Sequence, residues 1–223
     1  MRRVLLAGLV VALAAGCGGS GNDSTTVSTL TVTTEAVQQP VRVYFLRDGK
    51  VGPVARTSAS TGRAALLALQ AAGPTDRERA IGFDPGEATE KLAAQVFTLS
   101  QFAPTRPVVV DGKPYRRSDF EDLTPAILVE EPLPFARVSA PLRLRGTANT
   151  FEATFEYELL DPAGKVLTHH FVTATSGSGT RGIYDVKIPF EAPNGLGKLD
   201  VYELSAADGS RTHEVEIPLT LAR

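Results

Sequence analysis

The sequence has little of what a disulfide scaffold, a thiolate metal centre or a histidine-based catalytic site requires. Its 223 residues include one cysteine, one methionine, three histidines and no tryptophan. A single cysteine excludes an intramolecular disulfide and a metal site built from several thiolates. No apolar stretch of the sequence reaches the roughly 20 residues that a transmembrane helix needs. The lone cysteine therefore requires its own explanation.

The charges are nearly balanced, with 23 basic and 25 acidic side chains and a formal net charge of -2. Nucleic-acid binding relies on a basic patch or stripe, so we expect no nucleic-acid partner. The sequence contains neither a G-x-S-x-G element nor a Ser-x-x-Lys nucleophile. Three histidines also leave few general bases. We therefore predict a non-enzymatic protein with no catalytic residues and no cofactor.

The first residues form a short basic segment followed by an apolar one. Arg2 and Arg3 precede an uninterrupted apolar run over residues 4–15. As a helix this run would be about 18 Å long, which is too short for a hydrocarbon core of roughly 30 Å. The length and the flanking residues are typical of a secretory signal peptide.

Small residues lead up to Cys17, and the segment resembles a bacterial lipoprotein signal. In that family the cysteine becomes the lipidated first residue of the mature protein. Ala14 stands where the family prefers leucine, and Leu13 lies one position further out. The resemblance implies that residues 1–16 are a signal peptide and that Cys17 is lipidated and anchored on the extracytoplasmic face of the cell membrane. The alternative is an ordinary signal peptide that ends near Ala15, with the cysteine incidental.

Residues 17–39 are rich in threonine and serine and show no apolar period. Such a composition buries too little apolar surface to offset the conformational entropy of the chain. We expect a flexible tether between the lipid and the folded part of the protein.

The next segment mixes strand and helix patterns and predicts a small α+β domain over residues 40–124. Residues 41–56 indicate two strands joined at an Asp-Gly turn. Helices fit residues 60–73 and 87–102, and a further strand fits 107–110. The buried face of the first helix is expected to consist of Ala64, Leu67, Ala68 and Ala71.

Five blocks of this segment, in order, resemble the GerMN domain of spore-germination lipoproteins and of actinobacterial envelope lipoproteins. They are VRVYFLRDGKVGPVAR, ALLALQAAGPTDRERAIG, AAQVFTLSQF, VVVDGKPY and RRSDFEDLTPAI. The family carries a further pair of strands before its long helix, where this chain has only residues 83–92. The resemblance therefore implies a shortened GerMN domain.

Residues 125–223 carry the period-two pattern of half-buried strands. In FEATFEYEL, Phe151, Phe155 and Tyr157 fall on one face and glutamates on the other. Seven such short strands in fewer than 100 residues predict an all-β immunoglobulin-like sandwich. The seven strands are expected at residues 126–130, 141–147, 151–159, 166–174, 183–190, 199–206 and 213–221.

Three blocks of this half resemble the immunoglobulin-like domain of bacterial spore germination proteins. They are SAPLRLRGTANTFEATFEYELLDPAGKVL, TATSGSGTRGIYDV and VYELSAADGSRTHEVEIPLTL. That domain commonly follows a GerMN domain. The two resemblances together imply a membrane-anchored envelope lipoprotein that acts as a protein–protein interaction or assembly module in sporulation, germination or cell-envelope complexes.

The expected partners are the membrane, through the N-terminal lipid, and envelope proteins. An adaptor for a membrane kinase or transporter differs from this hypothesis only in its partner. The alternative is a module that binds peptidoglycan or another glycan. Sugar platforms need exposed aromatic side chains, whereas most phenylalanines and tyrosines here are expected to face inward.

Four groups of residues invite a site hypothesis, and each has a simpler structural interpretation. His169 and His170 are neighbours on a predicted strand, so their side chains point to opposite faces and do not readily chelate one ion. The glycine-rich loop 175–182 precedes a strand rather than a helix and lacks the Lys-Ser/Thr of a phosphate loop. We expect neither a metal site nor a phosphate site there.

The acidic residues fall into two further groups. Asp119, Glu121 and Asp122 are explained by helix capping and the helix dipole more simply than by a cation. Glu152, Glu156 and Glu158 are expected to form a solvated strand edge whose like charges deter strand addition. The sequence therefore predicts no metal ligands and only one modified residue, the lipidated cysteine.

Overall fold

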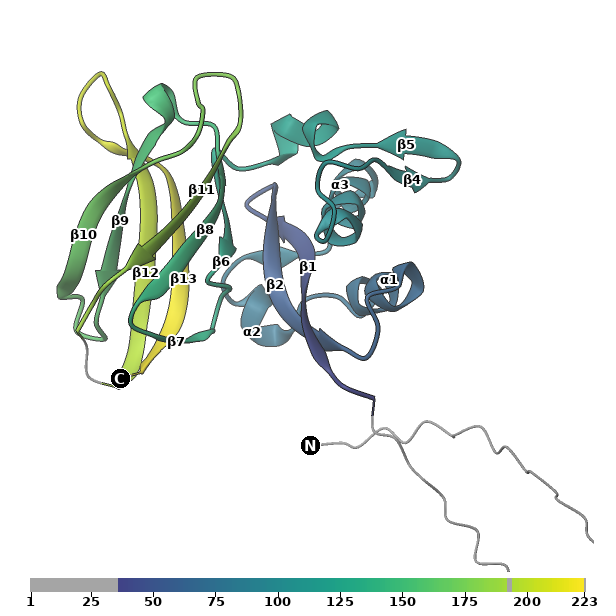
Figure 1. Cartoon of the computed structure of the whole chain (residues 1–223), viewed down its shortest axis with the longest axis horizontal. Coiled ribbons are helices and arrows are strands. Elements are labelled where there is room, and N and C mark those ends of the chain that lie inside the picture. The colour runs from purple at the N-terminus through teal and green to yellow at the C-terminus, as the bar shows by residue number, and fades with distance from the viewer. Residues whose placement is uncertain (1–35, 192–193, 223) are drawn as a thin grey trace, which may run out of the picture. The chain divides into compact units, whose positions relative to one another are not determined.

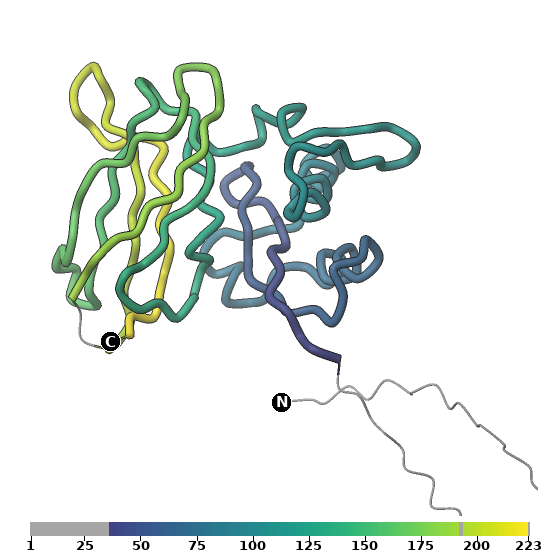
Figure 2. Tube along the Cα trace, viewed as in Figure 1, coloured from purple at the N-terminus to yellow at the C-terminus, as the bar shows by residue number. Residues whose placement is uncertain are grey.

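The computed structural model describes residues 36–191 and 194–222 (Figures 1 and 2). The predicted signal peptide, Cys17 and nearly all of the predicted tether lie outside the described residues. Residues 38–223 belong to one compact unit. The predicted boundary between residues 124 and 125 therefore stays a prediction. No helix among the described residues is long and apolar enough to cross a membrane.

The unit begins with an antiparallel hairpin of β1 (Gln39–Arg47) and β2 (Lys50–Ser58). Its turn is Asp48-Gly49, with φ angles of 53° and 72°, which the Asp-Gly pair adopts at little cost. The short strand β3 (Phe83–Asp84) pairs with the other edge of β1. The predicted hairpin is thus confirmed.

Helix α3 (Ala88–Ser100) packs on this hairpin, with the Tyr44 and Phe97 rings 5.4 Å apart. The other two helices are α1 (Arg63–Ala71) and α2 (Asp76–Arg79). In α1 the predicted buried face is wrong, because Leu66 is the buried residue and Ala64, Ala68 and Ala71 are exposed. A short helix of alanines and leucines has apolar side chains all round, so its packing against α3 and the β1–β2 hairpin selects the face.

A small hairpin follows, made of β4 (Val108–Val110) and β5 (Lys113–Tyr115), and leads into the 3₁₀ helix Arg117–Leu123. The capping carboxylate is Asp119, which accepts a hydrogen bond of 2.8 Å from the backbone N–H of Arg116. Capping therefore accounts for one member of the first acidic group.

The C-terminal half consists of two sheets, with strand orders β10-β9-β12-β13-β7 and β11-β8-β6 (Figure 1). All seven predicted strands are confirmed, and an eighth, β7, was not predicted because it has only three residues. The strands are β6 (Ile127–Glu131), β7 (Arg137–Ser139), β8 (Leu142–Ala148), β9 (Thr154–Leu160), β10 (Val166–Thr173), β11 (Gly182–Ile188), β12 (Gly195–Leu204) and β13 (Arg211–Ala222).

The two sheets enclose an aliphatic and aromatic core without a disulfide. Phe155 and Tyr184 meet edge to face with their ring centroids 4.8 Å apart, and Leu199 is fully buried in the same cluster. Phe151 was expected to face inward, but it is 58% exposed. It lies in a 3₁₀ turn, Phe151–Ala153, and the period-two pattern holds only from Thr154. The chain is mostly β, consistent with an immunoglobulin-like sandwich.

Candidate functional site

The strand β6 joins the N-terminal elements to the sandwich. Ile127 and Val129 face the sandwich core, and Leu128 belongs to the same apolar cluster as Tyr44 and Phe97. Because neighbouring residues of a strand point to opposite faces, β6 contributes to both cores at once. The region around this strand is the candidate site.

A buried polar network crosses this junction beside the apolar cluster. The Tyr44 hydroxyl donates a hydrogen bond to the Glu130 carboxylate. Arg117 Nη1 lies 2.8 Å from Glu130 Oε1, and Arg117 Nε donates to Ser100 Oγ at 2.8 Å. The side chains of Arg117 and Glu130 are only 14% and 8% exposed. The Arg117 guanidinium also lies 4.7 Å from the centre of the Phe97 ring, a cation–π distance.

The charges of this network follow from its surroundings. Burial alone would raise the pKa of Glu130, but the charge of Arg117 and the hydrogen bond from Tyr44 outweigh it, and the pKa is lowered. Burial and the neighbouring Glu130 charge raise the pKa of Tyr44 well above its ordinary value. Glu130 is therefore ionised and Tyr44 is protonated at neutral pH. The network is a satisfied buried ion pair, which positions β6 against β1 and α3.

The glycine-rich loop 175–182 anchors the same junction from the sandwich side. Arg181 Nη2 donates to Glu121 Oε1 and to the Pro125 carbonyl, both at 2.9 Å. A Cβ atom on Gly177 would lie 2.4 Å from the Thr150 carbonyl oxygen, so the glycine permits close backbone packing. This loop connects two strands, and its arginine holds it against Glu121 and Pro125.

The first acidic group divides among separate structural roles. Glu121 bonds Arg181 and also accepts from Asn149 Nδ2 at 2.9 Å. Asp122 interacts through its backbone carbonyl, which accepts a hydrogen bond of 2.6 Å from Lys50 Nζ. Helix capping explains only Asp119, so the sequence interpretation was incomplete for Glu121 and Asp122.

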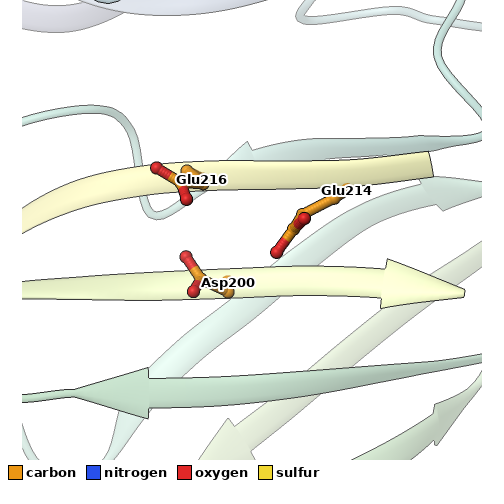
Figure 3. Close-up of side chains that lie close together, drawn as sticks. All are labelled: Asp200, Glu214 and Glu216. Carbon is orange, nitrogen blue, oxygen red and sulfur yellow. The ribbon is translucent and has the colours of Figure 1, made fainter. Parts of the chain in front are cut away.

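A different acidic cluster, which the sequence analysis missed, lies on the five-stranded sheet (Figure 3). One carboxylate oxygen each from Asp200 on β12 and from Glu214 and Glu216 on β13 lies within 4.8 Å of the other two. The register places Asp200 directly opposite Glu216. The alternation in HEVEI could have placed Glu214 and Glu216 on one face of a strand. The sequence gives no sign that Asp200 lies beside them, because that depends on the pairing of β12 with β13.

Oxygen donors of this kind suit a hard divalent cation, but this cluster already contains an ammonium group. Lys198 Nζ lies 2.9 Å from Asp200 Oδ2 and 2.8 Å from Glu216 Oε1. Burial raises the pKa of Asp200, and the charges of Glu216 and Glu214 raise it further against the opposing effect of Lys198. The cluster is a lysine-bridged carboxylate pair with a third carboxylate beside it, and we assign it no ligand.

The histidines and the second acidic group have separate partners, and only His169 and Glu156 pair with each other across strands. His169 Nε2 lies 2.7 Å from Glu156 Oε2, whereas His170 lies against the Phe171 ring. Glu158 accepts from Arg211 at 2.7 Å. The expected solvated edge is wrong, because β9 lies between β10 and β12. Glu152 does not share its strand face, since it lies in the 3₁₀ turn with a φ angle of 53°.

Two hollows flank β6. One is a cavity of about 220 Å³ with a mainly apolar lining that includes Pro53, Phe83 and Val215. The other is a cleft of about 690 Å³ whose lining includes four arginines, namely Arg42, Arg137, Arg143 and Arg145. The cleft combines guanidinium groups with proline, leucine and valine side chains.

Comparison with known proteins finds a family similarity in the second half of the chain. No curated protein matches the chain. The solved structure of CopC from Methylosinus trichosporium OB3b aligns with 40% of this chain and 85% of its own length at 20% identity, with a TM-score of 0.28. Residues 126–210 match the family model of the immunoglobulin-like domain of bacterial spore germination proteins, and this part of the chain is therefore similar to that domain.

Proposed function

We propose that the protein is a non-enzymatic envelope lipoprotein, anchored by Cys17, that acts as a protein–protein interaction module. The match of residues 126–210 to the spore germination domain carries this proposal, because it links the chain to germination-related proteins. The resemblance of residues 40–124 to the GerMN domain supports the same assignment. The role then belongs to complexes of germination, sporulation or the cell envelope.

The burial of the titratable side chains also supports binding rather than catalysis. Glu130, Arg117 and Tyr44 are already paired with one another in the interior, so they have no free group to offer a substrate. A general base has to reach the proton it removes. Of the three exposed histidines, His169 pairs with Glu156 across two strands, and His213 pairs with Glu203 at the lining of the smaller cavity.

The glycan-binding alternative receives less support from the aromatic residues. Tyr44, Tyr157, Tyr184 and Tyr202 are buried. The exposed phenylalanines, Phe102, Phe151 and Phe171, come from three separate elements. Of these only Phe102 lines the larger cleft. A sugar platform of stacked aromatic side chains is therefore not favoured.

The test is chemical cross-linking in cells of the tagged full-length protein, with identification of everything captured. The proposal predicts a small, reproducible set of envelope proteins, and a Cys17→Ser variant that is released from the membrane should lose them. Recovery of glycan fragments without protein partners would contradict it and support the alternative.

A further inference from the structure

The larger cleft beside β6 brings side chains from both parts of the unit together. Its lining comes from the start of β1, from β2, from the residues after α3, and from β6, β7 and β8. Four guanidinium groups and only two carboxylates, those of Glu130 and Glu131, line it. The excess of positive charge contrasts with the net charge of -2 of the whole chain.

Most of the negative charge in the cleft is already engaged. Glu130 pairs with Arg117, outside the cleft lining. Arg143 donates from Nε to Asp185 Oδ1 at 2.8 Å and lies 3.6 Å from Glu131. Of the remaining arginines, Arg42 acts on the already paired Glu130 and Arg145 acts on Asp185, which already pairs with Arg143. No carboxylate of the cleft lining is left free to neutralise Arg137.

Three guanidinium groups of the cleft have hydrogen-bond donors that no acceptor of the described chain fills. Across residues 36–191 and 194–222, the side chains of Arg137 and Arg145 make no hydrogen bond and no ion pair within 4.0 Å, although Arg145 lies opposite Asp185 and its charge helps to lower the pKa of that carboxyl. The buried Nε of Arg42 also has no partner, and its Nη2 makes only a 3.4 Å contact with the Gln101 carbonyl. A buried donor without an acceptor costs free energy, so an anionic acceptor in the cleft would stabilise Arg42 Nε.

The rest of the cleft lining indicates what kind of molecule would present the anionic group. The apolar part includes Pro40, Val41, Phe102, Leu133, Val138 and Pro141, and Phe102 is 58% exposed. All three residues of β7 line the cleft, and β7 is the outermost strand of the five-stranded sheet. An outer strand offers backbone groups that an extended chain can pair with.

We propose that this cleft binds an acidic, extended peptide segment of a partner protein. Carboxylates match the planar guanidinium fork of Arg137 and Arg145, and apolar residues between the carboxylates match the wall around Phe102. Inorganic phosphate or a phosphate polymer offers the charge but has no side chains for that wall. The inference rests on the proposed interaction function, whose partner chemistry it specifies.

The test uses the full-length protein in detergent and a short fluorescein-labelled peptide that alternates glutamate with valine, followed by fluorescence anisotropy at low salt. Saturable binding is expected, and a peptide that alternates lysine with valine should not bind. Arg137→Glu and Arg145→Glu should each weaken binding at least about fivefold, because each removes an attraction and adds a repulsion. The matched control is Lys165→Glu, a charge reversal in the exposed β9–β10 turn, which should leave the affinity unchanged.

The outcomes separate the inference from the proposed function. Absence of peptide binding, or equal weakening by Lys165→Glu, would overturn the cleft assignment and leave the cross-linking result in cells unaffected. Displacement of the peptide by stoichiometric inorganic phosphate or polyphosphate would instead identify a phosphate site and also overturn it. Circular dichroism of both arginine variants should match that of the wild type, since neither side chain bonds the rest of the described chain.

Discussion

The ion pair of Glu130 with Arg117 yields the sharpest prediction about stability. Glu130→Gln keeps the size of the side chain but removes its charge, and the Arg117 guanidinium then stays buried without a counter-ion. With exposures of 8% and 14%, solvent cannot replace the lost partner. Removal of one member of such a buried pair costs about 3–5 kcal/mol.

That loss is a large part of a typical unfolding free energy of about 5–15 kcal/mol. The assay is urea denaturation of the full-length protein at pH 7, followed by far-ultraviolet circular dichroism. Tyr44→Phe is an informative companion, because it deletes one hydrogen bond to the carboxylate and leaves the ion pair, so its cost is smaller, about 1–3 kcal/mol. The exposed pair of Arg143 and Asp185 provides the control, and Asp185→Asn should barely move the urea midpoint.

The same pair fixes the direction of the pH dependence. The pKa of Glu130 is lowered in the folded protein, so its stabilisation is present above the ordinary carboxyl pKa and is lost as the pH falls through the folded-state value. Glu130→Gln should therefore flatten the acid limb of the stability profile. A variant that unfolds at the wild-type urea concentration, with an unchanged acid limb, would refute the buried ion pair.

Three further predictions concern other parts of the chain. Phe155→Ala removes a buried ring of the sandwich core and should cost about 3–5 kcal/mol in urea denaturation; a cost below about 1 kcal/mol would place that ring outside the core. Asp200→Asn should raise the melting temperature at pH 7 and not at pH 3, because the raised pKa of Asp200 means that stability is lost as the pH rises through that value; a lower melting temperature at pH 7 would show that the bridge to Lys198 dominates. Cys17→Ser should leave the protein unprocessed or shed it from the membrane fraction, and full processing with firm attachment would defeat the anchor hypothesis.

The sandwich was predictable because each of its longer strands carries its own pattern. Phe155, Tyr157 and Leu159 alternate with polar residues, and the structure buries all three. Phe151 fits the same alternation but lies in a turn, because a period of two says nothing about where pairing with the next strand begins. The three-residue strand β7 is too short to carry any pattern at all.

The candidate site was much less predictable, because it is built from residues far apart in the chain. Tyr44 meets Glu130 across 86 residues, and Glu121 meets Arg181 across 60. No local pattern encodes such pairs. The cleft is a further example, since Arg42 and Arg145 look like ordinary surface arginines until the packing of β6 brings them to one hollow.

The interaction function is tested most directly by site-specific photocross-linking in cells. A photoreactive residue at Ser139, which lines the cleft on β7, is compared with one at Lys165 in the β9–β10 turn, which is not part of the cleft lining. The account predicts a reproducible set of protein adducts from position 139 that disappears with Arg145→Glu and is absent from position 165. The same adducts from both positions, or none from position 139, would contradict it.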